Sequence, residues 1–223
     1  MENRYSRTEK LIGSAGVNRL KSASVLVMGC GGVGSYAAEA VARAGIGSIT
    51  LMDGDDAAES NLNRQLVALT STIGCNKAEI MAARCRDINP DADITAIPKF
   101  YKTGEELDVR SFDWIIDAID DVDAKVLLIK NARDAGVDII SSMGAAGKFE
   151  TQFITADISE TSVCPLAKVM RKRLRDIGIE HVPVVYSKEK PVPRDGVLGT
   201  MSYVPGSCGL ELAGYVIKHI AGV

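Results

Sequence analysis

Up to Gly147 the chain alternates short apolar runs with longer segments whose apolar positions recur at helical spacing. The short runs are rich in Val, Ile and Leu, and several are nearly continuous in apolar character, which is typical of buried parallel strands. This pattern predicts strands over Ser24–Met28, Ser48–Met52, Ala92–Ile97, Asp113–Ile119 and Val137–Ser142. It predicts helices over Gly34–Ala44, Asn76–Ile88 and Val122–Ala135. Such alternation indicates an α/β fold with a doubly wound, Rossmann-like and mostly parallel sheet.

After Gly147 the pattern changes. Phe149–Ala156 and Thr200–Val204 have the composition of additional strands, which we expect to extend the sheet in the antiparallel sense. Pro183–Gly196 contains several prolines and mixed charge, which predicts a long loop. A loop of this length in a compact domain is usually functional or mobile. Ser207–Val223 is predicted to close the chain as a helix with one apolar stripe.

Length and composition are compatible with one water-soluble domain. The chain has 223 residues, of which 46% are apolar and 25% charged, as is ordinary for a globular protein. We therefore expect a single domain over residues 1–223, with a core at 1–147 and a C-terminal extension at 148–223 that includes the long loop 183–196. No apolar run is long enough to cross a membrane, and Met1–Lys10 lacks the apolar centre of a signal peptide. These features predict a cytoplasmic protein without membrane contact.

The cysteines do not suggest a metal site. Cys30, Cys75, Cys85, Cys164 and Cys208 form no CxxC pair, and none has a histidine at zinc-ligand spacing. We expect no zinc and no disulfide framework. The net charge is −3, so any contact with nucleic acid has to come from a local basic patch.

A glycine-rich segment joins the first predicted strand to the first predicted helix and fits the pattern GxGxxG. Gly29 permits a tight turn, Gly31 lets the backbone approach a phosphate, and Gly34 allows close packing of helix on strand, with Gly32 in the same loop. The start of the helix offers unpaired N–H groups and the positive end of its dipole to an anion. Glycine turns also serve packing alone, but this context predicts a nucleotide-binding core.

Asp53 ends the second predicted strand, about 20 residues beyond the glycines, where an acidic residue accepts hydrogen bonds from ribose hydroxyls. We assign the ribose to the sequence Asp53-Gly-Asp-Asp56 and include Asp55 among the cofactor-binding residues. The alternative is a cap of the turn at the end of the strand. The glycines and Asp53 together fit NAD, FAD and ATP equally well.

Asn61-Leu-Asn-Arg-Gln65 distinguishes these nucleotides, because it brings an arginine near the phosphates, where a dehydrogenase has no use for one. In these residues the chain resembles the E1-like superfamily, whose members activate carboxylates with ATP and include the ThiF and MoeB adenylyltransferases. The resemblance extends over residues 4–147 and implies ATP and Mg²⁺ as cofactors.

The resemblance also implies roles for individual residues. Asn61, Arg64 and Gln65 match the motif that holds the triphosphate, with Asp53 as the ribose-binding aspartate. Lys77 matches the motif lysine, and Asp120 matches the aspartate that positions magnesium. Arg7 matches an N-terminal arginine that family dimers insert into the neighbouring subunit's site. A homodimer is therefore expected.

These residue types suit the chemistry of adenylation. Attack of a carboxylate on the α-phosphorus of ATP concentrates negative charge on phosphate oxygens. Arg64 offers planar paired donors and Lys77 a point charge, while magnesium at Asp120 neutralises the leaving pyrophosphate. Catalysis then depends on positioning and electrostatics more than on a protein nucleophile. Taken singly, the two cations could be solvated surface charges and Asp120 a helix cap.

Within the superfamily the chain is similar to the tRNA threonylcarbamoyladenosine dehydratases, the TcdA branch. The similarity rests on Gly45–Asp56, Asn61–Leu69 and Pro165–Arg175, and on the absence of the CxxC pairs common in activators of ubiquitin-like proteins. It implies that ATP activates the carboxylate of a threonylcarbamoyl group on a tRNA adenosine, after which ring closure removes the equivalent of water. The similarity is also compatible with a sulfur-relay protein as a partner and with a site for a monovalent cation.

One difference from this branch lies in the predicted long loop. Some relatives have a cysteine just before a Ser-x-Glu sequence, whereas Val184-Val-Tyr-Ser-Lys-Glu189 contains none. Either that cysteine is dispensable, or this chain completes the reaction differently.

A basic run in the C-terminal part favours RNA as the acceptor. Lys168, Arg171, Lys172 and Arg175 are spaced to share one helix face, opposite Leu166, Met170, Leu174 and Ile177. Four cations on one face of an acidic protein suit contact with a phosphate backbone, although such runs are more often simply solvated.

Two other functions remain compatible with the sequence. The first is an adenylyltransferase that activates the C-terminal Gly-Gly tail of a ubiquitin-like or sulfur-carrier protein, as ThiF and MoeB do. The second is a nucleotide-binding scaffold without catalysis. Exchange of pyrophosphate into ATP in the presence of a carrier protein would favour the first, and retained nucleotide binding without turnover the second.

Overall fold

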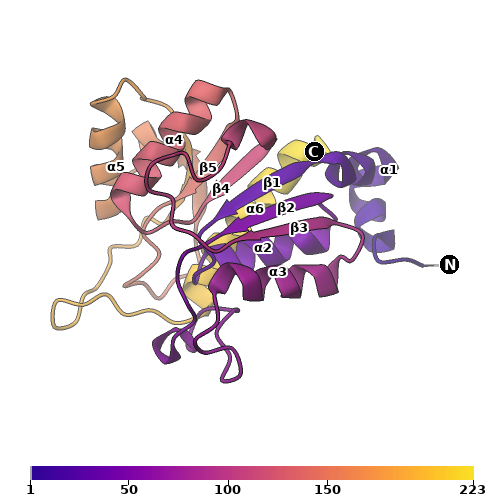
Figure 1. Ribbon diagram of the computed structural model, residues 1–223. Coiled ribbons are helices and arrows are strands. Elements are labelled where there is room, and N and C mark those ends of the chain that lie inside the picture. Colours follow the sequence, from indigo (N-terminus) through magenta and orange to yellow (C-terminus); the bar gives the residue numbers. More distant parts are fainter. Residues whose placement is uncertain (1) are drawn as a thin grey trace.

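The computed structural model describes residues 2–223, which form an α/β domain with helices on both faces of one sheet (Figure 1). The strands are β1 Ser24–Met28, β2 Ser48–Met52, β3 Asp93–Ile97, β4 Trp114–Asp117, β5 Asp138–Ser142, β6 Ile154–Asp157 and β7 Pro183–Tyr186. The helices are α1 Ser6–Ser22, α2 Gly34–Ala44, α3 Lys77–Ile88, α4 Val122–Ala135, α5 Pro165–Arg175 and α6 Tyr203–Ala221. Short 3₁₀ turns occur at Glu59–Asn61, Val109–Ser111 and Ile158–Glu160.

Within residues 2–223 the sheet has seven strands in the order β3-β2-β1-β4-β5-β7-β6. All neighbours are parallel except β6, which pairs antiparallel with β7. The chain builds outward from β1 through β2 to β3, and then returns to add β4 on the other side of β1. The predicted doubly wound, mostly parallel sheet with an antiparallel extension is confirmed. In such sheets ligands bind where the strand order reverses, at the carboxyl ends of the strands.

Successive residues of each central strand enter two separate cores. Val25 and Val27 of β1 pack with α1, α2, α3 and α6, whereas Leu26 and Met28 pack with α4 and α5. Figure 1 shows α4 and α5 on one side of the sheet and α2 and α3 on the other. Burial of both strand faces explains why these strands are almost uniformly apolar.

The predicted helices and the strands before Gly147 are found within a few residues of their expected bounds. Asn76 is the N-cap of α3 rather than its first residue, since its side chain accepts hydrogen bonds from the backbone of Ala78 and Glu79. The sequence pattern did not reveal α1, which has a kink at Gly13 and buries only a narrow face.

Three predictions in the C-terminal part are wrong. Thr200–Val204 is not a strand, because Tyr203 and Val204 already belong to α6, which begins before the expected Ser207. Of Phe149–Ala156, only the last three residues join a strand, β6. The predicted loop 183–196 begins with a strand, β7, whose Val184 and Val185 are buried between β5 and β6. Pro183 is tolerated there because it is the first residue of its strand.

The loop that does exist runs from residue 187 to residue 202 and is attached to the segment after Gly147. The carboxylate of Glu189 accepts hydrogen bonds from the backbone N–H groups of Phe149 and Glu150, each at 2.9 Å. These contacts hold the pKa of Glu189 below its usual range. None of the helices between residues 2 and 223 combines the length and apolarity needed to cross a lipid bilayer.

Candidate nucleotide-binding site

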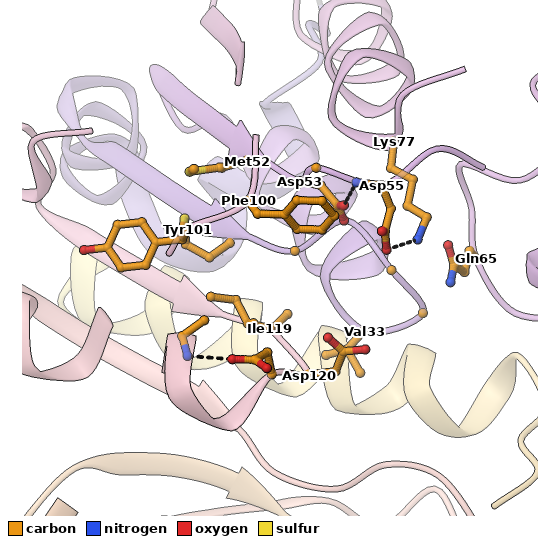
Figure 2. Close-up of a pocket in the computed structure, with 18 of the residues that line it drawn as sticks. Val33, Met52, Asp53, Asp55, Gln65, Lys77, Phe100, Tyr101, Ile119 and Asp120 are labelled. Atoms are coloured by element: carbon orange, nitrogen blue, oxygen red, sulfur yellow. Dashed lines mark hydrogen bonds and ion pairs between the residues drawn. The ribbon is translucent and has the colours of Figure 1, made fainter. Parts of the chain in front are cut away.

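A cleft of about 730 Å³ opens at the carboxyl ends of β1, β2 and β4, where the strand order reverses (Figure 2). The predicted site residues that line it are Gly29, Gly31, Gly32, Asp53, Asp55, Arg64, Gln65, Lys77 and Asp120. Residues far apart in the sequence thus meet at the position that the topology favours for a ligand.

The glycine loop forms one wall of the cleft and leads into α2. Gly29 has φ of 88°, and a Cβ atom there would lie 2.8 Å from the carbonyl oxygen of Ala118. A Cβ atom on Gly34 would lie 1.8 Å from the carbonyl oxygen of Gly29, so Gly34 serves close packing and does not line the cleft. Gly31 and Gly32 leave the start of α2 open to an anion.

Asp53 organises the cleft wall at the end of β2. Its carboxylate accepts hydrogen bonds from the backbone N–H of Cys30 at 2.6 Å and of Asp55 at 2.8 Å. Burial raises the pKa of Asp53 above its ordinary value, although the two N–H groups oppose the shift. A carboxylate offers about four acceptor positions, so lone pairs remain for ribose hydroxyls.

Lys77 is held at the cleft by the turn that precedes α3. Its ammonium is 2.9 Å from the carboxylate of Asp55, as Figure 2 shows, and its side chain is only 8% exposed. The side-chain amide of Asn76 donates to the backbone carbonyls of Asp53 and Asp55, each at 3.1 Å, and thereby fastens this turn to the end of β2. Lys77 therefore presents a fixed cation at the wall of the cleft.

The turn after residue 58 presents Arg64 and Gln65. Arg64 donates from Nη1 to the carbonyl of Ser60 and to the side chain of Asn63, both at 2.8 Å. Gln65 is buried, and its Oε1 has no hydrogen-bond partner among the described residues. Its amide oxygen can therefore still accept a hydrogen bond.

Asn61 lies behind this turn and does not line the cleft. Its side-chain oxygen accepts from the backbone of Ala58 at 3.1 Å, and its carbonyl accepts from the backbone of Arg64 and Gln65 at 3.0 Å. In this structure Asn61 shapes the turn that carries the other two residues.

The loop between β4 and α4 carries several carboxylates with different tasks. Asp121 caps α4 by accepting from the backbone N–H of Ala124 at 2.8 Å, and Asp123 pairs with Arg173 of α5 at 2.5 Å. Asp120 lines the cleft, is exposed, and has no hydrogen-bond or ion-pair partner to its carboxylate within residues 2–223. Nowhere in that range do three or more His, Cys, Asp or Glu side chains form a group that could hold a metal.

Arg7 does not line the cleft of its own chain. It lies in the first turn of α1, its side chain is 81% exposed, and it is 3.5 Å from Glu2. A role at the nucleotide would require a second copy of the chain.

Sequence reasoning missed the segment after β3, which lines the cleft with Lys99, Phe100, Tyr101 and Lys102. Phe100 is half exposed, and a Cβ atom on Gly54 would lie 2.5 Å from its ring. In the view of Figure 2, Tyr101 lies at one end of the cleft and Gln65 and Lys77 at the other. Because these residues follow a predicted parallel strand, their position at its carboxyl end was the available signal. Thr200 and Pro205, from the C-terminal part, also reach the cleft.

The basic face predicted on α5 is smaller than expected. Lys168, Lys172 and Arg175 are exposed and have no ion-pair partner within residues 2–223. Arg171 instead turns toward the protein and donates to the carbonyls of Ile158 at 3.2 Å and Thr161 at 2.8 Å. The correction has a simple cause, since a neighbouring 3₁₀ turn packs against the helix at this point.

The opposite face of α5 is also shorter than predicted. Met170 and Leu174 are fully buried, and Leu166 is partly buried against the same core. Ile177 lies beyond the end of the helix and is 43% exposed.

Known proteins resemble this chain in sequence and in structure. The ThiF family model matches residues 5–223. The chain is 41% identical over 242 residues to the tRNA threonylcarbamoyladenosine dehydratase of Bacillus subtilis (strain 168), covering 99% of this chain and 95% of that protein. It is 40% identical over 180 residues to the protein of that name from Escherichia coli (strain K12), covering 79% and 67%. A solved structure of the E. coli dehydratase TcdA in complex with ATP matches with a TM-score of 0.92 and 35% identity, over 98% of this chain and 94% of that one.

Proposed function

The chain belongs to the ThiF family, and from its match to the dehydratases we propose that it is an ATP-dependent tRNA threonylcarbamoyladenosine dehydratase. The carboxylate of the threonylcarbamoyl group attacks the α-phosphorus of ATP, which forms an acyl-adenylate and releases pyrophosphate. A neighbouring atom of the same group then attacks the acyl carbon, and AMP leaves with one carboxylate oxygen. The product is cyclic and has lost the equivalent of one water. The main support is a cleft lined by groups that suit phosphates and a ribose, in a chain that matches dehydratases over nearly its whole length.

The groups on the cleft wall suit a triphosphate. The start of α2 and the backbone of Gly31 and Gly32 would receive phosphate oxygens. Among the described residues only Nη1 of Arg64 is engaged, so the rest of its guanidinium is available for a bidentate contact. Lys77 would exchange Asp55 for a phosphate, while Asp53 would hold the ribose.

Asp120 fits a site for Mg²⁺. This ion keeps several waters and is usually bound through one or two carboxylates together with substrate phosphates. An exposed carboxylate that has no partner within residues 2–223 and lines the cleft meets that requirement without a cluster of protein ligands. Bound Mg²⁺ would neutralise negative charge on the departing pyrophosphate.

We assign the tRNA backbone to three exposed cations of α5 that have no ion-pair partner within residues 2–223, which are Lys168, Lys172 and Arg175. We further propose a homodimer in which Arg7 reaches the partner subunit's cleft, and a cytoplasmic location, where tRNA is modified. The loop 187–202 contains no cysteine, so a sulfur-relay protein has no thiol to address on it.

The deciding experiment supplies ATP, Mg²⁺ and tRNA that carries threonylcarbamoyladenosine, followed by digestion and mass spectrometry of the nucleosides. We expect the modified nucleoside to lose one water, with one AMP and one pyrophosphate formed per event. Omission of ATP and the Arg64→Ala variant are the controls. Unchanged tRNA, together with pyrophosphate exchange that depends on a carrier protein ending in Gly-Gly, would overturn the proposal in favour of the ThiF-like alternative.

A further inference from the structure

A fully buried ion pair lies behind the cleft wall that carries Asp120. Asp117 is the last residue of β4 and Lys125 belongs to α4, and both side chains are 0% exposed. Their carboxylate oxygen and ammonium nitrogen are 3.0 Å apart. Neither residue lines the cleft.

Such a pair is a poor source of stability. Removing two charges from water costs about as much as their attraction returns, and apolar residues of similar volume often serve as well or better. The space between β4 and α4 could be filled by a hydrophobic contact, as it is around Ile115 and Ile129. The charges therefore point to a task that apolar side chains could not perform.

That task is visible in the bonds to Ile119. The carboxylate of Asp117 accepts from the backbone N–H of Ile119 at 3.1 Å, and the ammonium of Lys125 donates to the carbonyl of the same residue at 3.0 Å. Ser141 completes the carboxylate's partners by donating to it at 2.6 Å. The residue immediately before Asp120 is thus held at both of its polar backbone groups.

The residues around Ile119 are held as well. Ala118 donates its backbone N–H to Met28 at 2.8 Å and meets the glycine loop at Gly29. Asp121 is fixed as the cap of α4. Asp120 therefore lies between two anchored residues, its carboxylate has no partner among the described residues, and Figure 2 shows it at the cleft.

We propose that Asp117 and Lys125 are positioning residues that hold Asp120 where its carboxylate can share a divalent cation with the phosphates of ATP. This inference rests on the proposed function. The pair acts through the backbone of Ile119 and touches neither nucleotide nor metal. Because the loop is ordered before the ligand arrives, no binding free energy is consumed in ordering it.

The double variant Asp117→Leu/Lys125→Met tests this, since it removes both charges, leaves neither unpaired and removes both bonds to Ile119. Calorimetry measures the dissociation constant of a non-hydrolysable ATP analogue, once with Mg²⁺ and once with a chelator. We expect the metal-free constant to match the wild type. The factor by which Mg²⁺ tightens binding should fall about 10-fold to 100-fold, the usual range for residues that support a metal ligand.

Two further variants separate positioning from general stability and from the proposed function. Ser141→Ala removes a donor to Asp117 but keeps both bonds to Ile119, so its Mg²⁺ effect should equal that of the wild type even if its melting temperature falls. Asp120→Asn should abolish the Mg²⁺ effect. If Asp120→Asn has no consequence, the metal role in the proposed function fails. If Asp120→Asn abolishes the Mg²⁺ effect but the folded double variant keeps the wild-type Mg²⁺ effect, the positioning role alone is overturned.

Hydrogen exchange of the wild-type protein gives a test that needs no variant to fold. Without nucleotide, the amide of Ile119 should be protected as strongly as the neighbouring amides of β4. Exchange at the rate of an open loop would overturn the inference, because the pair would then not hold the residue.

Discussion

Arg64 and Lys77 both bring positive charge to the cleft, but they differ in how many of their donor groups are already engaged by the protein. Lys77 is buried and paired with Asp55, whereas Arg64 is braced through one nitrogen and keeps its other donors for a ligand. A guanidinium in this position can bind two phosphate oxygens in one plane, which an ammonium cannot. The two cations are therefore not interchangeable.

We predict that Arg64→Ala lowers kcat by about 100-fold to 1,000-fold, the usual loss when one donor to developing charge is removed. Arg64→Lys should recover only part of this rate, because it restores charge but not the paired geometry. Single-turnover measurement of AMP formation provides the comparison. Full recovery in Arg64→Lys would show that charge alone is required.

We predict that Asp53 makes nucleotide affinity depend on pH. Its pKa is raised by burial, and in the proposed function the ribose needs the ionised carboxylate as acceptor. As pH falls through this raised pKa, the protonated fraction grows and ADP affinity should decrease. The decrease should begin at a higher pH than for an ordinary aspartate with a pKa of about 3.9.

Calorimetric titration with ADP over a series of acidic pH values checks this prediction. Asp53→Asn should bind more weakly and should lose the pH dependence of the wild type. Asp56→Asn, at an exposed position outside the cleft, should keep it. An unchanged pH dependence in Asp53→Asn would assign the titration to another group.

At the scale of elements, α5 shows that a sequence pattern can predict a helix correctly while the role predicted for one of its residues is wrong. The spacing of its charges and apolar residues predicted the helix and its buried face. Arg171 nevertheless lies against the turn at Ile158–Glu160, where it donates to the carbonyls of Ile158 and Thr161. A periodic pattern gives the direction of a side chain but not what packs beside it.

We predict that the triple variant Lys168→Glu/Lys172→Glu/Arg175→Glu raises the KM for tRNA at least about 10-fold and reduces its salt dependence, since phosphate contacts release counterions. Its affinity for ATP should be unchanged. Arg171→Met is the matched control. It should lower the free energy of unfolding by about 1–3 kcal/mol through lost hydrogen bonds, with little effect on tRNA affinity.

Steady-state kinetics at several salt concentrations give the KM for tRNA and its salt dependence. Thermal unfolding gives the change in the free energy of unfolding. If the triple variant binds tRNA as the wild type does, the RNA surface lies elsewhere.

At the scale of the whole molecule, the proposed dimer can be tested by mixing subunits. If Arg7 acts in the partner subunit's cleft, a dimer of one Arg7→Ala chain and one Arg64→Ala chain contains one intact site. Random mixing of equal amounts should then restore about a quarter of the wild-type sites. Dehydratase activity after mixing and re-association is the measurement. No recovery, or a monomer with full activity in solution scattering, would contradict the role of Arg7.

The sequence by itself determined the central strands, the helices between them and the glycine loop, because these depend on local apolar periodicity and on backbone freedom within a few residues. It also contained Asp53, Arg64, Lys77 and Asp120 as candidates. It did not reveal β7, since Pro183 and neighbouring prolines resemble a loop until β5 and β6 bury Val184 and Val185.

Only the tertiary structure decided what each candidate touches. It moved Asn61 behind the cleft, brought the segment after β3 and the start of α6 to its walls, and joined Asp117 to Lys125 beneath Asp120's loop. The physical reason is that these relations depend on long-range packing and on where buried polar groups find partners, and neither is encoded in the spacing of residues along the chain.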